Sequence, residues 1–266
     1  EAGIKTHATL LFVANVGEEG EGDLRGVKHL LEDAERRQRL RAMVVIDGAS
    51  NERLTRRALA SKRFEIIVRG PGGHSWADFG LPNPIHVLAR VVSDSTRFRI
   101  PKRPRTVFNV GKIAGGTSVN AIPYQAAMKI DIRSESEAEI ERLEGALRKA
   151  VEQAVTAENH AAQRQEKLSF EIRVIGVRPG GEVPESVRIV EVFRAVDRHL
   201  GIQTQFRTSS TDANVPIALG LEAVAVGGGG RGGASHSLRE WYEPTGREAG
   251  LKRILLAVLL LTGVEL

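Results

Sequence analysis

The sequence predicts an α/β protein in which a sheet domain, mainly parallel with helices on both faces, is interrupted by an inserted α+β domain. Near both ends of the chain, apolar runs alternate with amphipathic helices, which is typical of a mainly parallel sheet covered by helices. Between them, apolar and polar residues alternate at every second position, which is typical of antiparallel strands with one buried face. We therefore expect one domain at residues 1–62 and 182–266, and an inserted domain at residues 63–181.

The first part of the split domain reads as strand, loop, helix and strand. Residues 8–16 form a continuous apolar run, which we interpret as a buried strand. Residues 23–35 place their apolar side chains at helical spacing. Residues 43–46 are a second apolar strand. Because strand and helix alternate, these elements favour a parallel sheet.

The alternation of predicted strands and helices returns near the end of the chain. Residues 187–200 predict a helix that ends at Gly201, a typical position for glycine after a helix. Residues 223–226 are a short apolar strand that leads into a glycine run. Residues 247–261 predict the last helix. These elements complete the split domain.

The inserted stretch predicts an antiparallel sheet with two helices. Its strands are expected around residues 64–69, 126–133 and 170–174. One helix follows a Pro-Asn-Pro sequence and runs to about Arg97. The other begins at Ser136, which forms a capping-box pattern with Glu139.

Composition excludes several classes of protein. The chain has 266 residues, a formal net charge of +5 and 5% aromatic residues, and its basic residues are scattered without a stacking motif, so we expect no nucleic-acid partner. It has no cysteine, which excludes disulfides and thiolate metal sites. No apolar stretch reaches the roughly 18 residues of a membrane span, and we expect a cytoplasmic protein without membrane contact. The chain begins with Glu1 rather than methionine, so we expect a segment upstream.

Two adjacent carboxylates, Glu18 and Glu19, follow the first apolar run and open a glycine-broken loop. Consecutive side chains leaving a strand point in different directions. One carboxylate can therefore bind a cation while its neighbour takes a proton from water, the arrangement of a metallohydrolase. Asp47 ends the second strand, so it also lies where α/β sheets place their ligands. The alternatives are an acidic surface turn for the pair and a simple turn for Asp47.

These acids stand in one series with four further motifs, which are GGHS at 72–75, GGTSVNAIP at 115–123, TDAN at 211–214 and His-Ser at 236–237. In this order the set resembles the zinc-dependent exopeptidases and deacylases that include aminoacylase, succinyl-diaminopimelate desuccinylase, carboxypeptidase G and peptidase T, and it looks closest to the peptidase T-like members. The resemblance implies a zinc-binding catalytic domain, an inserted domain that makes a homodimer, and hydrolysis of an amide bond in small peptides or N-acyl amino acids.

The resemblance also assigns roles around the metal. It implies that Glu18 is the general base, that Glu19 and His236 are ligands of one zinc ion, and that Asp47 is a ligand of the second. Cobalt and manganese suit the same oxygen and imidazole donors. For His236 taken alone, a surface histidine is the alternative.

Further roles concern the substrate. The resemblance implies that His74 reaches the partner subunit's site and stabilises the oxyanion, and that Asn120 crosses the dimer to hold the substrate. Arg133 would bind a substrate carboxylate, a task that suits a planar guanidinium. Ser210 lies in a loop near the substrate, beside Asp212, which we expect to orient that loop. A turn histidine and an exposed strand charge are the alternatives for His74 and Arg133.

Two ligands of the family pattern have no counterpart here. They are a histidine in a His-x-Asp motif and a bridging aspartate, both upstream of the Glu-Glu pair. No Asp occurs before Asp23, and His7 does not match by spacing. We therefore expect the chain to be the later part of a longer enzyme. The alternative is a non-catalytic module of the same family that dimerises and binds a small ligand.

Overall fold

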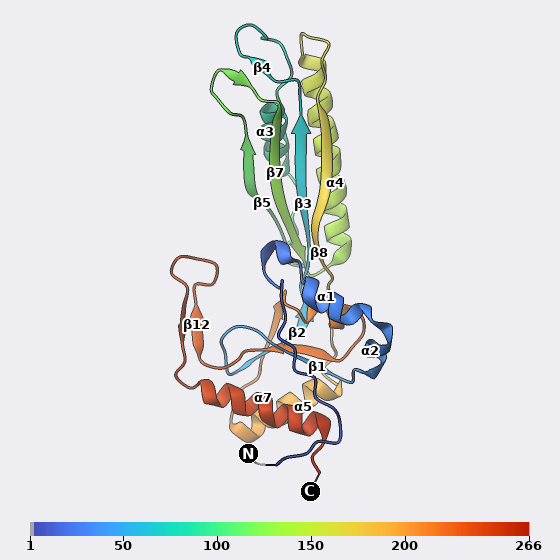
Figure 1. The fold of residues 1–266 in the computed structure, drawn as a ribbon, viewed down its shortest axis with the longest axis vertical. Coiled ribbons are helices and arrows are strands. Elements are labelled where there is room, and N and C mark those ends of the chain that lie inside the picture. Colours follow the sequence, from blue (N-terminus) through green and yellow to red (C-terminus); the bar gives the residue numbers. More distant parts are fainter. Residues whose placement is uncertain (1–2, 266) are drawn as a thin grey trace. The chain divides into compact units, whose positions relative to one another are not determined.

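A computed structural model describes residues 3–265, and it divides into two compact units (Figure 1). The split unit consists of the chain up to Leu59 and from Arg178 onward. The inserted unit is Ala60–Val177. Each unit has its own apolar core, so each is described by itself below.

The split unit is built on a five-stranded sheet with the order β1-β11-β2-β10, in which β9 also pairs with β2. Its strands are β1 (Met43–Ile46), β2 (Arg53–Ala58), β9 (Gly181–Glu182), β10 (Gln205–Ser209) and β11 (Ala223–Val226). β1 is parallel to β11, and β10 is parallel to β2. β2 joins these two parallel pairs by running antiparallel to β11. The predicted α/β class is confirmed, and β1 and β11 lie where the sequence places strands.

Helices α5 (Arg188–Leu200) and α7 (Arg247–Thr262) pack against each other and share an apolar core with the sheet. α5 ends where predicted, because Gly201 takes the left-handed conformation that L residues avoid. The smaller elements are η1 (Gly20–Gly22), α1 (Arg25–Glu32), α2 (Ala34–Arg39), α6 (Asn214–Ala218), β12 (Arg231–Gly233) and β13 (Trp241–Glu243). β12 and β13 form a hairpin that was not predicted.

Two predictions for the start of the split unit are wrong. Residues 8–16 form no strand, and their apolar side chains are exposed, with Phe12 88% accessible. A strand needs a hydrogen-bonded neighbour, whereas the backbone contacts of this run lie at its ends, from Ala8 to Thr262 and from Gly26 to Val16. The helix expected at 23–35 is broken at Asp33, which is extended and caps α2 by accepting from the Arg36 amide.

The inserted unit has a four-stranded sheet with the order β5-β7-β3-β8. Its strands are β3 (Ala60–Arg69), β5 (Thr106–Gly115), β7 (Gln125–Ser134) and β8 (Ser169–Arg178), and a small hairpin-like pair is formed by β4 (Gly73–His74) and β6 (Ala121–Ile122). β7 is antiparallel to both β3 and β5. The three strands predicted here are confirmed, and β5 is an addition to them.

Helices α3 (Pro84–Ser95) and α4 (Glu137–Ala161) cover one face of this sheet (Figure 1). Alternating residues such as Phe64, Met128 and Ile132 are buried beneath them. α3 begins at Pro84 behind the Asn83 cap, as the Pro-Asn-Pro sequence indicates. α4 begins after Ser136, but the predicted capping bond is not made by its hydroxyl.

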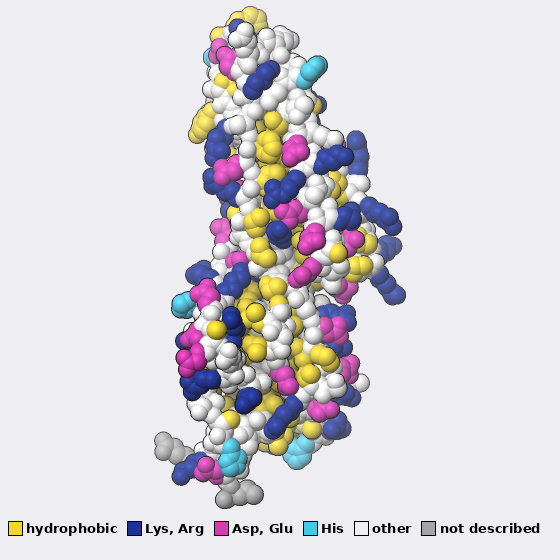
Figure 2. All heavy atoms as spheres, turned by 90° about the vertical axis from the view of Figure 1, so that its right-hand side faces the viewer, with side chains coloured by type: hydrophobic (Ala, Val, Ile, Leu, Met, Phe, Trp, Pro, Cys, Tyr) yellow, Lys and Arg dark blue, Asp and Glu magenta, His cyan; other side chains and the backbone are white. Residues whose placement is uncertain are grey.

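The other face of the sheet carries charges that are paired. Asp131 accepts from both Arg63 and Arg133, and Glu171 accepts from Arg69. Figure 2 shows acidic and basic side chains interspersed on the surface in view, with apolar side chains between them. Among the helices of residues 3–265, none has both the length and the apolarity required to span a bilayer.

Candidate functional site

The structure brings four carboxylates of the split unit into one electrostatic neighbourhood. Glu18, Glu19, Asp47 and Asp212, called the acidic site below, come from the loop before η1, the end of β1 and the loop before α6. Of these, Glu18, Glu19 and Asp47 were predicted as site residues. The rule that ligands gather at the carboxyl ends of strands accounts for Asp47, whose amide donates to Val226 of the neighbouring strand.

Arg178 is the cation of the acidic site. Its side chain is only 6% accessible, and its Nη1–H group donates to Glu18 Oε1 at 3.0 Å. Nη2–H donates to the main-chain carbonyl oxygen of the same residue. Nη1 also contacts the Ser210 hydroxyl at 3.3 Å. Ser210, predicted near the substrate, is therefore joined to Glu18 through one guanidinium.

The electrostatics of the acidic site are those of crowded acids, of which Glu19 is exposed and the other three are at least partly buried. Burial raises the pKa of Glu18; the Arg178 charge opposes that rise, and the charges of Glu19, Asp47 and Asp212 add to it. Burial likewise raises the pKa of Asp212 against a hydrogen bond from Asn15 at 2.5 Å. The acidic site thus carries more negative charge than Arg178 alone balances.

Two buried atoms at this site, Asp212 Oδ1 and Arg178 Nε, have no hydrogen-bond partner among the described residues. Asp212 Oδ1 is buried and accepts no hydrogen bond from any described residue. A buried carboxylate oxygen left unpaired is costly, and carboxylate oxygens are ligands for divalent cations. The donors of the acidic site are therefore of the kind that binds a divalent cation, although no three of them converge as ligands among the described residues.

His236 lies apart from this arrangement. It follows β12 in an exposed loop, with a positive φ of 64°, and its amide donates to Glu240. Within residues 3–265, no three side chains of His, Cys, Asp or Glu converge as a set of metal ligands. A strained backbone at a non-glycine residue is found more often at functional sites than elsewhere. Because the described side chains do not converge around His236, its role as a metal ligand stays a prediction.

A buried asparagine fixes the loops that frame the acidic site. Asn214 is inaccessible to solvent and donates from Nδ2 to the carbonyl oxygens of Leu59 and Pro179, both at 2.9 Å. Its Oδ1 accepts from the Thr211 amide. The TDAN loop and the backbone just after Arg178 are therefore tied together, which holds Asp212 of the same loop in place.

In the inserted unit, His74 and Asn120 are neighbours, although they come from different motifs. β4 pairs with β6 so that His74 faces Ala121, and the Ser75 amide donates to the Asn120 carbonyl at 2.9 Å. The Nδ1 atom of His74 accepts from the amides of Trp76 and Ala77. With Nδ1 used as an acceptor, Nε2 is the ring nitrogen that would donate a hydrogen bond.

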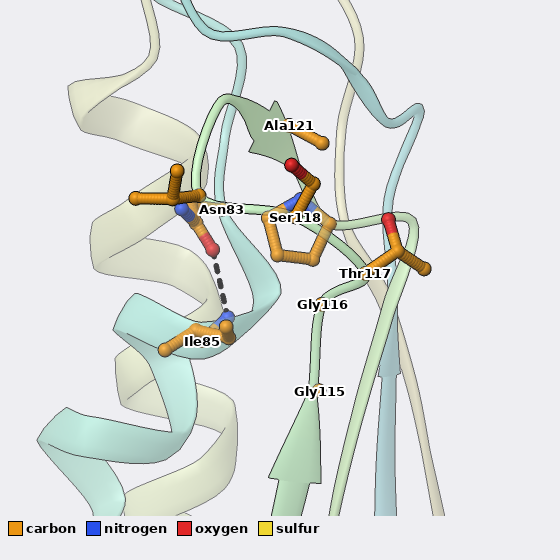
Figure 3. Close-up of a pocket in the computed structure, with 9 residues that line it drawn as sticks. Asn83, Ile85, Gly115, Gly116, Thr117, Ser118 and Ala121 are labelled. Carbon is orange, nitrogen blue, oxygen red and sulfur yellow. Dashed lines mark hydrogen bonds between the residues drawn. The ribbon is translucent and has the colours of Figure 1, made fainter.

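A cavity of about 400 Å³ adjoins this pair of motifs (Figure 3). It is lined by the glycine loop after β5, by Asn83 and Ile85 at the start of α3, and by Ala121 and Pro123. Thr117 and Ser118 supply its hydroxyl groups. The inserted unit thus has a polar, loop-built recess beside His74 and Asn120, of the size that holds a small ligand.

Arg133 lies on the charged face of the inserted sheet. Its Nε donates to Asp131 Oδ2 at 2.6 Å, and Asp131 also accepts from Arg63. Its side chain is 38% accessible. The guanidinium is therefore ion-paired within its own sheet and retains an exposed edge that can meet an anion.

Sequence reasoning missed Arg178 and Asn15. Arg178 stands in a Val-Arg-Pro-Gly stretch at the point where the period-two pattern of the insert ends. A lone arginine before a proline gives no functional signal, because arginine is common on strand surfaces. Only the fold shows that it is buried against Glu18.

Comparison with known proteins places the inserted unit in a family. Residues 59–158 match the peptidase dimerisation domain of the M20 type. An N-acetylcysteine deacetylase of Bacillus subtilis is 33% identical over 79 residues, which are 27% of this chain and 20% of that protein. Most of the inserted unit therefore matches the M20 peptidase dimerisation domain.

Solved structures match almost the whole chain. An aminopeptidase PepT from Bacillus cereus has a TM-score of 0.71 at 20% identity, over 94% of this chain and 63% of that one. A tripeptidase from Staphylococcus aureus has a TM-score of 0.72 at 18% identity, over 93% and 63%. A dinuclear metal binding peptidase of the M20 family from Bacillus subtilis has a TM-score of 0.62 at 16% identity, over 92% and 64%. The chain has the fold of M20 peptidases and spans less than two thirds of the length of these relatives.

Proposed function

We propose that this chain, in which an M20 peptidase dimerisation domain interrupts a domain with the M20 peptidase fold, serves as a metal-dependent hydrolase. Its substrates would be small peptides or N-acyl amino acids, cleaved at an amide bond. The observation that carries the proposal is the acidic site, where Glu18 and Glu19 lie beside Asp47 and Asp212 with one buried carboxylate oxygen unpaired. Relatives in fold include an aminopeptidase and a tripeptidase, and a relative in sequence is a deacetylase, which supports this class of reaction.

The metal would be held by this chain's Glu19, Asp47 and His236. Zinc fits their oxygen and imidazole donors, and one relative of the same fold is described as a dinuclear metal binding peptidase. When bound, the metal supplies Lewis-acid chemistry, because it polarises the scissile carbonyl and lowers the pKa of water. We expect His236 to move with its exposed loop when it takes this role.

Glu18 would act as the general base. Arg178 occupies its Oε1 atom, and the Glu18 side chain is 29% accessible, so its Oε2 atom would be the one to meet water. This oxygen would take the proton of the attacking water and then deliver it to the leaving amine. A raised carboxyl pKa brings the group nearer to neutral pH, where a carboxylate transfers protons most efficiently.

The inserted domain would supply the substrate contacts. We propose that His74 of the partner subunit offers its Nε2–H group to the developing oxyanion, since its Nδ1 already accepts two amides. One such donor is commonly worth about 3–4 kcal/mol in acyl transfer. Asn120 and Arg133 would hold the substrate, the latter through its carboxylate, and Ser210 would contribute a hydroxyl from the split unit. This arrangement requires a homodimer, which is what a dimerisation domain provides.

The experiment is to compare the wild-type chain with Glu18→Gln and Glu19→Gln. Bound metal is measured by elemental mass spectrometry, and hydrolysis is followed with a panel of tripeptides and N-acyl amino acids. We expect Glu18→Gln to keep its metal and to lose roughly 10²–10⁴-fold in turnover. Glu19→Gln should lose the metal as well. Unchanged turnover in Glu18→Gln would refute the mechanism.

A non-catalytic module that dimerises and binds a small ligand is the second candidate. It is favoured by the absence of three converging metal ligands among residues 3–265. Zinc stoichiometry after equilibration decides between the two, because a hydrolase needs tightly held ions. Tight, stoichiometric zinc supports the hydrolase, whereas weak and non-stoichiometric zinc together with ligand binding supports the module.

A further inference from the structure

Arg178 makes two different kinds of contact with a single residue. Nη1–H meets the Glu18 carboxylate, and Nη2–H meets the Glu18 main-chain carbonyl. A guanidinium is planar and rigid, so two parallel bonds to one residue fix its orientation as well as its position. The side chain and the backbone of Glu18 are thus held by the same group, which lies 160 residues away in the sequence.

Arg178 is itself held in place by contacts other than those to Glu18. It ends strand β8, and the carbonyl oxygen of the next residue, Pro179, accepts from the fully buried Asn214. Its Nη1 is also shared with the Ser210 hydroxyl. Burial of the guanidinium removes competing water. These contacts leave the arginine little freedom to choose another partner.

The segment that carries Glu18 needs such support. Gly17 and Gly20 both have positive φ, and so do Asp23 and Leu24. Its backbone bonds include those from Gly22 to Glu19 and from Gly26 to Val16. A short segment with two glycines in left-handed conformations has high backbone freedom when unsupported. The Glu18 carboxylate would sample many positions without an external anchor.

We propose that Arg178 is a positioning residue that fixes the Glu18 loop and occupies Glu18 Oε1, so that Oε2 alone faces the reacting water. This inference deepens the proposed function and rests on it for the role of Glu18 as base. Arg178 does not touch the substrate. It acts through Glu18. Its loss should leave the Glu18 carboxylate without a fixed position, rather than weaken substrate binding.

The primary test is hydrogen–deuterium exchange on the full chain, followed in peptides that cover residues 17–26. In Arg178→Gln we expect the protected amides of Gly22 and Gly26 to exchange at least tenfold faster. Arg178→Lys keeps a charge and one donor contact, and its exchange should be intermediate. Arg56→Gln is the matched control, because Arg56 also bonds two acids of the split unit, Glu182 and Glu185, but not this loop. It should leave residues 17–26 unchanged.

Steady-state kinetics supply the second readout. Positioning predicts that kcat falls in Arg178→Gln while KM stays near the wild-type value, with partial recovery in Arg178→Lys. A raised KM with unchanged kcat would make Arg178 a substrate-binding group and would overturn the inference. So would wild-type exchange of residues 17–26 in Arg178→Gln. If the wild-type chain hydrolyses none of the substrates, the proposed function fails, and so does the proposed role of Glu18 as general base. The exchange data then still show whether Arg178 anchors the loop.

Discussion

The buried ion pair between Arg253 of α7 and Asp197 of α5 gives the sharpest stability prediction. Both side chains are 1% accessible. Nε and Nη2 of Arg253 donate to the two oxygens of Asp197 at 2.6 and 2.8 Å, and Nη1 donates to the Arg53 carbonyl at 2.8 Å. Thr204 donates a further bond to Asp197. Every strong donor and acceptor of the pair is therefore satisfied, and helices α5 and α7 are tied to the start of β2.

Arg253→Met removes one charge and leaves the other buried. Asp197 would keep only the Thr204 bond, and the Arg53 carbonyl would lose its donor. Removing one partner of a buried pair costs about 3–5 kcal/mol in the free energy of unfolding. Changing both residues, as in Asp197→Leu with Arg253→Met, removes the unpaired charge, so most of that loss should be recovered. The interaction is strongly non-additive because the two side chains touch.

Urea unfolding followed by circular dichroism measures these differences. Glu182→Gln is the control, because Glu182 pairs with Arg56 and Arg57 at a site where its side chain is 40% accessible, and exposed pairs contribute about 1 kcal/mol or less. A loss below 1 kcal/mol in Arg253→Met would contradict the reasoning. A double variant as unstable as the single variant would contradict it too, because the cost would then come from packing rather than from charge.

Two further predictions concern pH and assembly. Burial alone would raise the pKa of Glu144, but hydrogen bonds from Lys62 and Arg148 outweigh it and hold that pKa below its usual value of 4.5. As pH falls, the unfolded chain therefore binds this proton before the folded chain does. Glu144→Gln should lower the free energy of unfolding by about 1–2 kcal/mol above pH 4.5, and this loss should shrink as pH falls through the folded-state pKa. A pH series of urea midpoints measures it. If His74 acts across the dimer, mixing inactive Glu18→Gln and His74→Ala subunits should restore part of the hydrolysis through hybrid dimers, and no recovery in proven hybrids would contradict that role.

Elements with a local cause could be predicted from the sequence. α5 ends at Gly201 because glycine alone adopts the left-handed conformation without strain, and this depends on no distant residue. β11 is an apolar run between turn residues, and it is buried on both faces. In the strands of the inserted sheet, apolar and polar residues alternate, and this alternation directly indicates a sheet with one buried face. In each case the signal and its cause lie in the same segment.

The failures have a non-local cause at residues 8–16 and local causes in the other two segments. Residues 8–16 have the composition of a buried strand, yet a strand exists only beside a partner, and composition says nothing about whether one is available. The predicted helix at 23–35 was broken because Asp33 finds more favourable bonding as a cap than inside a helix. β5 was missed because its mid-strand register shift disturbs the alternation that identifies a strand.

The candidate site shows the same division between local and non-local causes. Glu18, Glu19 and Asp47 could be placed together because each follows an apolar run in an α/β pattern, and they do share one electrostatic neighbourhood. Three of the four acids, Glu18, Asp47 and Asp212, are at least partly buried, and they cannot be gathered without compensating positive charge, since unpaired buried charges are costly. Sequence reasoning assigned that compensation to a metal alone. The fold adds a cation of the protein's own, Arg178, on one side of the acids, and it leaves Asp212 Oδ1 unpaired. The residual negative charge is the part that a metal would have to balance, so the metal affinity of the acidic site should depend on Arg178 as well as on the ligands.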